Sequence, residues 1–295
     1  MMNGRVDLHI HSSHSSDGDY PPAALLRMAK ENGLKAISIA DHDTVEAYPE
    51  ALEYSLKTGV ELIPSIELTT LYEGREFHLL LPFVRWNSPK LKRILLTVNV
   101  ARMEEAKERV ARLRELGFDI HWDEVIRKTR GKPPLGVNIA QILIDEGRKK
   151  EMPSLRNYYE GENRLFAPYF FYRDYFLEGR PAFVPKRTVS LLEVLDLTDG
   201  DETAPVLAHP GAYFERATRE DLAVLKKRGL VGLEVYSSYH DIEQIRLYKA
   251  AAEELDLVAT AGSDFHGRIK PHVVFGCLKE GTYRMVEELK ARRRM

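Results

Sequence analysis

The sequence is poor in cysteine and in long apolar runs. Its 295 residues include one cysteine, Cys277, which cannot form an intramolecular disulfide and so favours a reducing compartment. Because Cys277 lies in the apolar run 273–278, we expect it to be buried in the core. No run reaches the ~20 apolar residues of a membrane span, and the first residues lack the apolar stretch of a signal peptide. These absences predict a cytoplasmic protein that does not contact a membrane.

The sequence also lacks a strong net charge. The formal net charge of −2 argues against a general binder of polyanions. The charges are unevenly spread, however, because residues 84–200 contain 22 Lys and Arg against 17 Asp and Glu. The rest of the chain contains 21 basic and 28 acidic residues. The basic part therefore suits a phosphorylated ligand, whereas the acidic part suits cations.

Short apolar runs alternate with helical segments at both ends of the chain. The strand-like runs cover 6–10, 36–40, 62–68, 77–81, 204–208, 230–235 and 257–261. Strands that alternate with helices at this spacing predict a parallel α/β fold. Between them, residues 84–200 contain mainly helical segments and no low-complexity linker. We therefore expect a barrel-like α/β body formed by residues 1–83 and 201–295, with a mainly helical insertion at 84–200 that acts as a substrate cap.

Histidines and acids follow these strand-like runs. His9 and His11 close the first run, His42 follows the second, Glu67 ends the third, His78 lies in the fourth, His209 follows the fifth, and Asp264 and His266 follow the last. In a parallel barrel the carboxyl ends of all strands open onto one face, so these side chains would converge. One histidine alone is more often a hydrogen-bonded structural residue. A group of this size, with Asp17 added, predicts divalent cations that compensate the buried charge.

The spacing of the first two histidines supports a metal site. In a strand, residues i and i+2 point to the same side, so His9 and His11 can bind one metal while Leu8 and Ile10 face the core. Mixed imidazole and carboxylate ligands suit Mn²⁺, Fe²⁺ or Zn²⁺, whereas Mg²⁺ and Ca²⁺ prefer oxygen ligands. The His-X-His motif alone is a moderately specific signal of a metal site. In combination with the acids and histidines that follow the later strands, it is a strong signal.

Five motifs together resemble the PHP (polymerase and histidinol phosphatase) family. They are Asp7-Leu8-His9-Ile10-His11 with Ser16-Asp17-Gly18, Ala40-Asp41-His42-Asp43-Thr44, Ile63-Pro64-Ser65-Ile66-Glu67, Leu207-Ala208-His209-Pro210-Gly211 and Gly262-Ser263-Asp264-Phe265-His266-Gly267. All the metal motifs of the family are present in order. The resemblance implies a distorted seven-stranded β/α barrel, similar to a TIM barrel, with two or three metal ions at the carboxyl ends of the strands.

The resemblance also implies how the ligands are divided. One metal would be held by His9, His11, Glu67 and Asp264, a second by the bridging Glu67 with His78 and His209, and a third by Asp17, His42 and His266. Asp17 lies six residues after His11 where many relatives have five, so His14 competes for its role. The Ser-Asp-Gly context favours Asp17. Asp41 and Asp43 are expected to orient histidine ligands.

The expected chemistry is the hydrolysis of a phosphate monoester. Two metal ions about 4 Å apart can bind a bridging hydroxide and lower the pKa of the attacking oxygen toward neutrality. Glu67, His209 and Asp264 are the expected catalytic residues, and no covalent enzyme intermediate is expected. His240 and His272 are candidates to protonate the leaving group, although a hydrogen-bonded structural role is the usual one for such a histidine.

The insertion is expected to choose the substrate, which we expect to be a mononucleotide or a 3′,5′-bisphosphate. Related phosphoesterases open a helix of the insertion with a Gly-Arg-Pro-His-type stretch, where this chain has Leu-Gly-Val-Asn at 135–138. Either Arg127, Arg130 or Lys132 takes over phosphate binding, together with Arg180, or the substrate differs. The aromatic residues of the insertion have two open interpretations, stacking on a base or packing in its own core. They are Tyr158, Tyr159, Phe170, Phe171 and Tyr172.

Three other functions remain open. The same metal chemistry would serve a 5′–3′ exonuclease acting on short RNA or DNA, or a phosphatase of the histidinol-phosphate type. A non-catalytic, metal-stabilised binding module is the alternative from a different class. The complete set of nine candidate ligands argues against that module, which has no need of so many. We predict no obligate protein partner. The expected ligand is a small phosphorylated substrate or a short oligonucleotide.

Overall fold

The computed structural model describes residues 4–161, 164, 166–198, 200, 202–212 and 216–293. The chain divides into two compact units. The first unit combines Met1–Leu95, Val189–Arg268 and Val273–Met295, and the second combines Leu96–Thr188 with Ile269–His272. The first unit is therefore assembled from both ends of the chain.

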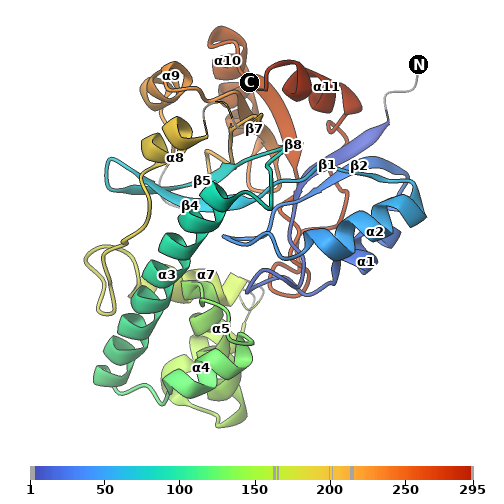
Figure 1. Cartoon of the computed structure of the whole chain (residues 1–295). Coiled ribbons are helices and arrows are strands. Elements are labelled where there is room, and N and C mark those ends of the chain that lie inside the picture. The colour runs from blue at the N-terminus through green and yellow to red at the C-terminus, as the bar shows by residue number, and fades with distance from the viewer. Residues whose placement is uncertain are drawn as a thin grey trace. The chain divides into compact units, whose positions relative to one another are not determined.

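The first unit begins with a parallel sheet of three strands. Its order is β1 (Arg5–Ile10), β2 (Leu34–Ile39) and β3 (Glu61–Leu62), and the crossovers are α1 (Pro22–Glu31) and α2 (Tyr48–Thr58). Proline at the first position of α1 suits a helix start, and Gly59 ends α2 in the left-handed conformation at a φ of 75°. The two helices lie side by side next to this sheet (Figure 1) and bury Leu25 and Leu26 against Ile37 and Ile39.

A second sheet of five strands completes the first unit. Its order is β4 (Glu67–Tyr72), β5 (Arg75–Leu80), β6 (Val206–Leu207), β7 (Gly232–Ser237) and β8 (Val258–Gly262). The helices of this part are α8 (Leu191–Leu197), α9 (Arg219–Lys227), α10 (Ile242–Glu254) and α11 (Tyr283–Ala291). β4 and β5 form a hairpin whose turn residues Glu73 and Gly74 have φ angles of 50° and 78°, as a type I′ turn requires.

The predicted seven-stranded barrel is wrong, because the strands form separate sheets of three and five strands. The β4–β5 pair is antiparallel, and so is the β5–β6 pair. Pro64 has no amide hydrogen for a ladder, and β3 ends at Leu62, two residues before it. Between the sheets, the described residues form isolated bridges at Ile10 with Phe265 and at His42 with Glu67. The two sheets thus meet beside the candidate metal ligands.

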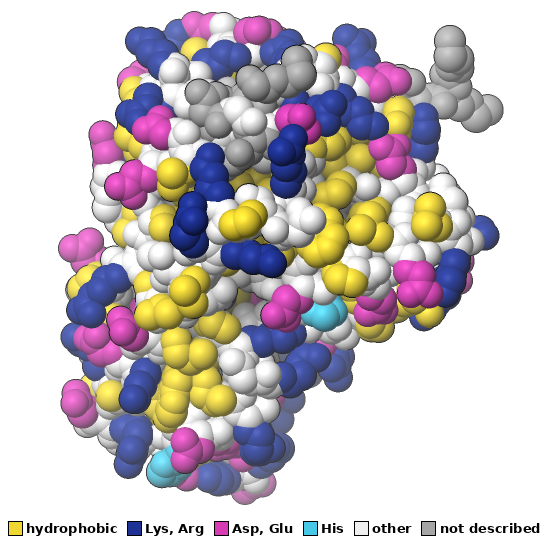
Figure 2. All heavy atoms as spheres, in the orientation of Figure 1, with side chains coloured by type: hydrophobic (Ala, Val, Ile, Leu, Met, Phe, Trp, Pro, Cys, Tyr) yellow, Lys and Arg dark blue, Asp and Glu magenta, His cyan; other side chains and the backbone are white. Residues whose placement is uncertain are grey.

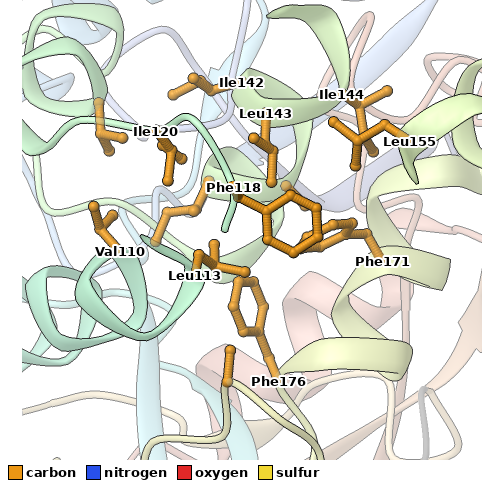
Figure 3. Packing of buried hydrophobic residues seen from close by; sticks show 14 of the residues in the cluster. Val110, Leu113, Phe118, Ile120, Ile142, Leu143, Ile144, Leu155, Phe171 and Phe176 are labelled. Carbon is orange, nitrogen blue, oxygen red and sulfur yellow. The ribbon is translucent and has the colours of Figure 1, made fainter. Parts of the chain in front are cut away.

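The second unit is helical and has a core of its own. α3 (Pro89–Glu115) begins in the first unit and continues into the second, where α4 (Trp122–Lys128), α5 (Gly136–Lys149), η1 (Pro153–Leu155), α6 (Arg156–Tyr159) and α7 (Ala167–Tyr175) follow. Figure 3 shows Leu113, Phe118, Phe171 and Phe176 pointing toward one another in this core. Phe171 is fully buried there, so it packs the core and cannot stack on a base. Among the described residues, no helix has the length and apolar character needed to cross a membrane.

Cys277 is exposed, so the prediction of a buried cysteine is wrong. The apolar run that contains it forms turns between β8 and α11 instead of a strand. Val273 and Phe275 of this run are buried. Gly276 then adopts a φ of 63°, a left-handed turn after which the next side chain faces solvent.

Candidate metal centre

The structure brings the predicted metal ligands together inside the first unit. Three overlapping groups have ligand atoms within 4.8 Å of one another: His9, His11, Glu67 and Asp264; His11, Asp17, His42 and His266; and His42, Glu67 and His78. His209 joins them through Glu67, because its Nε2 lies 3.0 Å from Glu67 Oε1. The members of these groups are buried, apart from His78, whose side chain is 11% exposed. The face shown in Figure 2 accordingly has little histidine surface.

Backbone contacts between β1 and the segment after β8 position the first group. The His11 amide donates to the Phe265 carbonyl at 2.9 Å, and the Asp264 amide donates to the His9 carbonyl at 2.8 Å. Asp264 has a φ of 56° and His209 a φ of 23°, both unusual for residues other than glycine. Such backbone strain is concentrated at functional sites, where the surrounding structure holds it in place.

Glu67 lies at the centre of the cluster, and its two oxygens face different histidines. On one side, Oε1 lies 2.8 Å from His78 Nδ1 and 3.0 Å from His209 Nε2. These histidines come from β5 and from the loop after β6. Glu67 is the first residue of β4, which pairs with β5.

The other oxygen of Glu67 faces three further imidazoles. Oε2 lies 2.9 Å from His42 Nδ1, 3.2 Å from His11 Nε2 and 3.3 Å from His9 Nε2. Despite these distances, Oε2 accepts no hydrogen bond of good geometry within the described part of the chain. His9 Nε2 and His11 Nε2 are 3.1 Å apart. Lone pairs that converge in this way, in a buried place, suit a divalent cation, so the residues fit a metal centre.

Charge in the cluster shifts the pKa values strongly. Burial alone would raise the pKa of Glu67, but His42, His9 and His78 outweigh it and hold the pKa well below 4.5. Burial would lower the pKa of His78, but Glu67 outweighs it and raises that pKa to about 10. The pKa of His9 is likewise raised well above 6.5: burial would lower it, but Glu67, Glu234 and Asp264 together outweigh that effect. In the metal-free chain, Glu67 therefore stays anionic, and His78 and His9 stay protonated and cationic.

The third group contains Asp17 and not His14. Asp17 Oδ2 lies 3.2 Å from His266 Nε2 and 3.6 Å from His42 Nε2. The Ser15 hydroxyl donates to the other Asp17 oxygen at 2.6 Å. Burial would raise the pKa of Asp17, but the two imidazoles outweigh it and lower the pKa well below 3.8. His14 is half-buried, its Nδ1 lies 3.9 Å from the exposed Glu46, and it belongs to none of the three groups.

The two candidate proton donors lie in different surroundings. His240 uses both ring nitrogens: Nδ1 lies 2.8 Å from the Val235 carbonyl, and Nε2 accepts from the Gly211 amide at 3.0 Å. Burial lowers the pKa of His240. This histidine therefore holds two loops together and is not available to protonate a leaving group. His272 lies in the second unit and is exposed, with its ring 4.6 Å from that of Phe166.

Asp41 and Asp43 bind backbone segments beside the cluster. Asp41 accepts from the Ser12 amide and the Ser12 hydroxyl, both at 2.6 Å. Asp43 accepts from the Thr69 amide at 2.9 Å. Asp41 therefore fixes the loop that follows His11, and the expectation that Asp41 and Asp43 orient histidine ligands stays a prediction.

Sequence reasoning missed two groups that contact the cluster. The carboxylate of Glu234 on β7 lies 2.8 Å from His9 Nδ1. The hydroxyl of Tyr239 donates to Asp264 Oδ2 at 2.8 Å. An acid inside the apolar run 230–235 is the signal that would have found Glu234, since a buried charge needs a partner.

The four cations predicted to bind phosphate all lie in the second unit. Arg127 belongs to the last turn of α4, Arg130 and Lys132 lie in the turn after it, and Arg180 follows α7. Both Arg127 and Arg180 are exposed. None of the four belongs to the three ligand groups, and their role remains a prediction.

Comparisons with known proteins agree with this site. The PHP domain matches residues 7–174, more than half of the chain. A 3′,5′-nucleoside bisphosphate phosphatase of Chromobacterium violaceum is 25% identical over 264 residues, 88% of this chain and 87% of that protein. A 5′-3′ exoribonuclease of Haemophilus influenzae is 25% identical over 267 residues, 90% of this chain and 91% of the relative.

Solved structures show the same fold. A candidate metal-dependent phosphoesterase from Bifidobacterium adolescentis superposes with a TM-score of 0.80 at 27% identity, over 98% of this chain and 96% of the other. An amidohydrolase from Chromobacterium violaceum gives the same TM-score at 24% identity, over 99% and 98% of the two chains, and supports the fold alone. The fold and site define a metal-dependent phosphoesterase, a hydrolase of phosphoric esters. The chain belongs to the PHP domain family.

Proposed function

We propose that this enzyme hydrolyses phosphate monoesters of nucleotides, either mononucleotides or 3′,5′-bisphosphates. The observation that carries the proposal is the environment of Glu67. One oxygen faces His78 and His209, and the other faces His42, His11 and His9. A carboxylate between two sets of imidazoles suits a bridge between two cations, the arrangement used in two-metal phosphatases.

Three sets of residues would hold two or three divalent cations, which we propose to be Mn²⁺, Fe²⁺ or Zn²⁺. The first set is His9, His11, Glu67 and Asp264; the second is Glu67, His78 and His209; and the third is Asp17, His42 and His266. Because these side chains are buried and convergent, they would strip a cation of most of its water and hold it in fixed geometry.

When bound, the cations would lower the pKa of a water molecule and compensate negative charge on the phosphoryl oxygens. The chain itself supplies position and charge. Glu67 remains anionic because its pKa is held well below 4.5, although burial alone would raise it, and Asp264 is oriented by the Tyr239 hydroxyl at 2.8 Å. His209 faces Glu67 Oε1, the oxygen that also faces His78.

The ligand assignment is tested by substitution and metal analysis. We expect His9→Ala and Asp264→Ala to lower phosphate release from nucleotides at least about 100-fold, because each removes a direct metal ligand and not merely a supporting partner. The bound metal, measured by mass spectrometry, should fall in parallel. His121→Ala is the control, since His121 is 60% exposed and contacts Asp119 instead of the cluster. Full activity in both site variants would contradict the assignment.

The substrate is tested by a phosphate-release screen with Mn²⁺. We expect nucleoside monophosphates and 3′,5′-bisphosphates to release phosphate faster than sugar phosphates or histidinol phosphate. The similarity to a 3′,5′-nucleoside bisphosphate phosphatase over 88% of the chain supports this expectation. Faster turnover of histidinol phosphate than of any nucleotide would reject the nucleotide proposal but leave the metal centre intact.

A 5′–3′ exonuclease is the second candidate, and similarity to exoribonucleases of Haemophilus influenzae and Escherichia coli supports it. The two activities are separated with a short RNA that carries a 3′ label. A phosphatase leaves its length unchanged, whereas an exonuclease shortens it from the 5′ end one nucleotide at a time.

We propose that the second unit selects the substrate through Arg127, Arg130, Lys132 and Arg180. Replacing each by Ala should raise KM for a bisphosphate with little change in kcat, because a cation of this kind contributes to binding and not to the reacting centre. An unchanged KM in all four variants would reject this role.

A further inference from the structure

The strand β7 contributes no residue to the three ligand groups, yet it carries a buried acid. Glu234 is 1% exposed, and its neighbours Leu233 and Val235 are buried apolar residues. A carboxylate in such a place is costly unless it is paired. Its pairing partner is His9, whose Nδ1 lies 2.8 Å from Glu234 Oε2. These two residues are 225 positions apart in the sequence.

The neighbouring strand β8 leaves space for this pair. A Cβ atom on Gly262 would lie 2.3 Å from the Cβ of His9 and 2.6 Å from Glu234 Oε2, closer than atoms can approach. Gly262 ends β8 and pairs with Ser237 of β7. Only glycine at position 262 therefore allows the Glu234 carboxylate and the His9 imidazole to meet over β8. Their contact is thus a specific feature of the fold.

We propose that Glu234 is a positioning residue for the metal ligand His9. By accepting the hydrogen of His9 Nδ1, Glu234 fixes the neutral imidazole in the tautomer whose Nε2 carries the lone pair. That Nε2 is the atom that faces the other ligands, at 3.3 Å from Glu67 Oε2 and 3.4 Å from Asp264 Oδ1. The inference rests on the proposed metal centre, because orienting Nε2 matters only if His9 binds a cation.

Two substitutions separate positioning from simple packing. Glu234→Gln keeps the volume and an acceptor oxygen but removes the charge, and Glu234→Leu removes the acceptor and keeps a side chain of similar bulk. Ser237→Ala is the control, because it removes another buried polar group from the same strand. If Glu234 only filled space, Glu234→Leu would bind metal as the parent does.

The measurement is the affinity of the whole protein for Zn²⁺, obtained by competition with a chelator. Loss of a carboxylate that orients a metal-binding histidine typically costs about 10- to 100-fold in affinity. We expect Glu234→Leu to lose about 100-fold, Glu234→Gln about 10-fold and Ser237→Ala nothing. Visible absorption of the Co²⁺-loaded protein should change in both Glu234 variants and remain unchanged in the control.

The outcomes distinguish this inference from the function on which it rests. A parent protein that binds neither Zn²⁺ nor Co²⁺ would overturn the metal centre itself. A parent that binds both, with unchanged affinity and spectrum in the Glu234 variants, would overturn only the role of Glu234. Circular dichroism of the metal-free proteins verifies folding, and Glu234→Gln decides the question if Glu234→Leu does not fold.

Discussion

The charge of Glu67 determines the protonation state of His78, and so what must happen when a cation binds there. Glu67 outweighs the effect of burial and raises the pKa of His78 to about 10, so this imidazole carries a proton at pH 7 in the metal-free chain. A metal ligand must be neutral, and metal binding therefore has to displace that proton. As the pH rises toward 10, His78 loses this proton more readily, so the proton competes less with the cation for the imidazole nitrogen.

We expect Zn²⁺ binding at pH 7 to release at least one proton and its affinity to rise with pH. Calorimetric titration in two buffers of different ionisation enthalpy measures the number of protons released. A binding heat that does not depend on the buffer would contradict protonation of His78 in the metal-free chain. The control is His14→Ala, since His14 lies outside the ligand groups.

The ligand residues could be predicted from the sequence because most of them lie in, at the end of or just after a strand-like run, as His9, His42 and Asp264 show. The partners beyond them were harder to find. Glu234 contacts His9 across 225 positions, and Tyr239 contacts Asp264 across 25. Neither belongs to a motif. Glu234 and His9 meet because β7 pairs with β8, whose last residue Gly262 lies beside both of them.

Among the elements, the β4–β5 hairpin has the most direct effect on the site, because it carries both Glu67 and His78. The second strand of this hairpin, β5, begins with Arg75, which donates to both oxygens of Asp221 on α9, at 2.9 and 2.6 Å. Asp221 also accepts from the Thr218 amide at 2.7 Å and so caps that helix. One buried carboxylate therefore connects the hairpin to α9.

We expect Asp221→Asn to lower the free energy of unfolding by about 1–3 kcal/mol at pH 7, the usual cost of losing a charged hydrogen-bond partner. Burial would raise the pKa of Asp221, but its hydrogen bonds with Arg75 and Thr218 outweigh this and lower it. The folded-state pKa is thus below the unfolded value, so the stabilisation is complete above pH 3.8 and is lost as the pH falls through the folded-state pKa.

Urea unfolding at several pH values measures the difference in the free energy of unfolding between the parent and Asp221→Asn. This difference should become smaller as the solution becomes acidic. The matched control is Asp196→Asn, because Asp196 also pairs with an arginine, Arg228, but is 54% exposed. Exposed pairs contribute little, so the control should lose far less stability. Equal losses in both variants would contradict the role given to Asp221.

Most strands could be predicted from apolar runs, but the run 62–68 is not one strand, because β3 ends at Leu62 and β4 begins at Glu67. The directions of the strands could not be predicted. Apolar runs such as 62–68 and 77–81 do not indicate whether the next strand returns in the same direction. The turn at Glu73 and Gly74 reverses the chain after two residues, which makes β4 and β5 antiparallel. A Glu-Gly pair between two strand-like runs is compatible with such a turn, and a turn of two residues joins antiparallel and not parallel strands.

For the whole molecule, metal binding and stability should be linked. The first unit buries Asp17, Glu67, Asp264 and Glu234 among its histidines. A cation that binds only the folded state stabilises it, by about 2.7 kcal/mol when its concentration is 100 times its dissociation constant. Removing the metal therefore takes this stabilisation away.

We expect treatment with a chelator to lower the melting temperature by several degrees, and addition of Mn²⁺ or Zn²⁺ to restore it. Differential scanning calorimetry provides the measurement. His9→Ala, which removes a ligand, should make the melting temperature insensitive to the chelator. The same melting temperature with and without metal in the parent protein would contradict the linkage.

The second unit has a core of its own, formed by residues such as Leu113 and Phe171, and the chain crosses into it at a small number of positions, among them 95–96 and 188–189. Changes within that core are absorbed locally, because their packing partners belong to the same unit. Under the role proposed for the second unit, its residues can change what is recognised while the buried ligands of the first unit stay the same. We therefore expect an exchange of residues 96–188 between relatives to change the substrate preference and to leave the metal ligands in place.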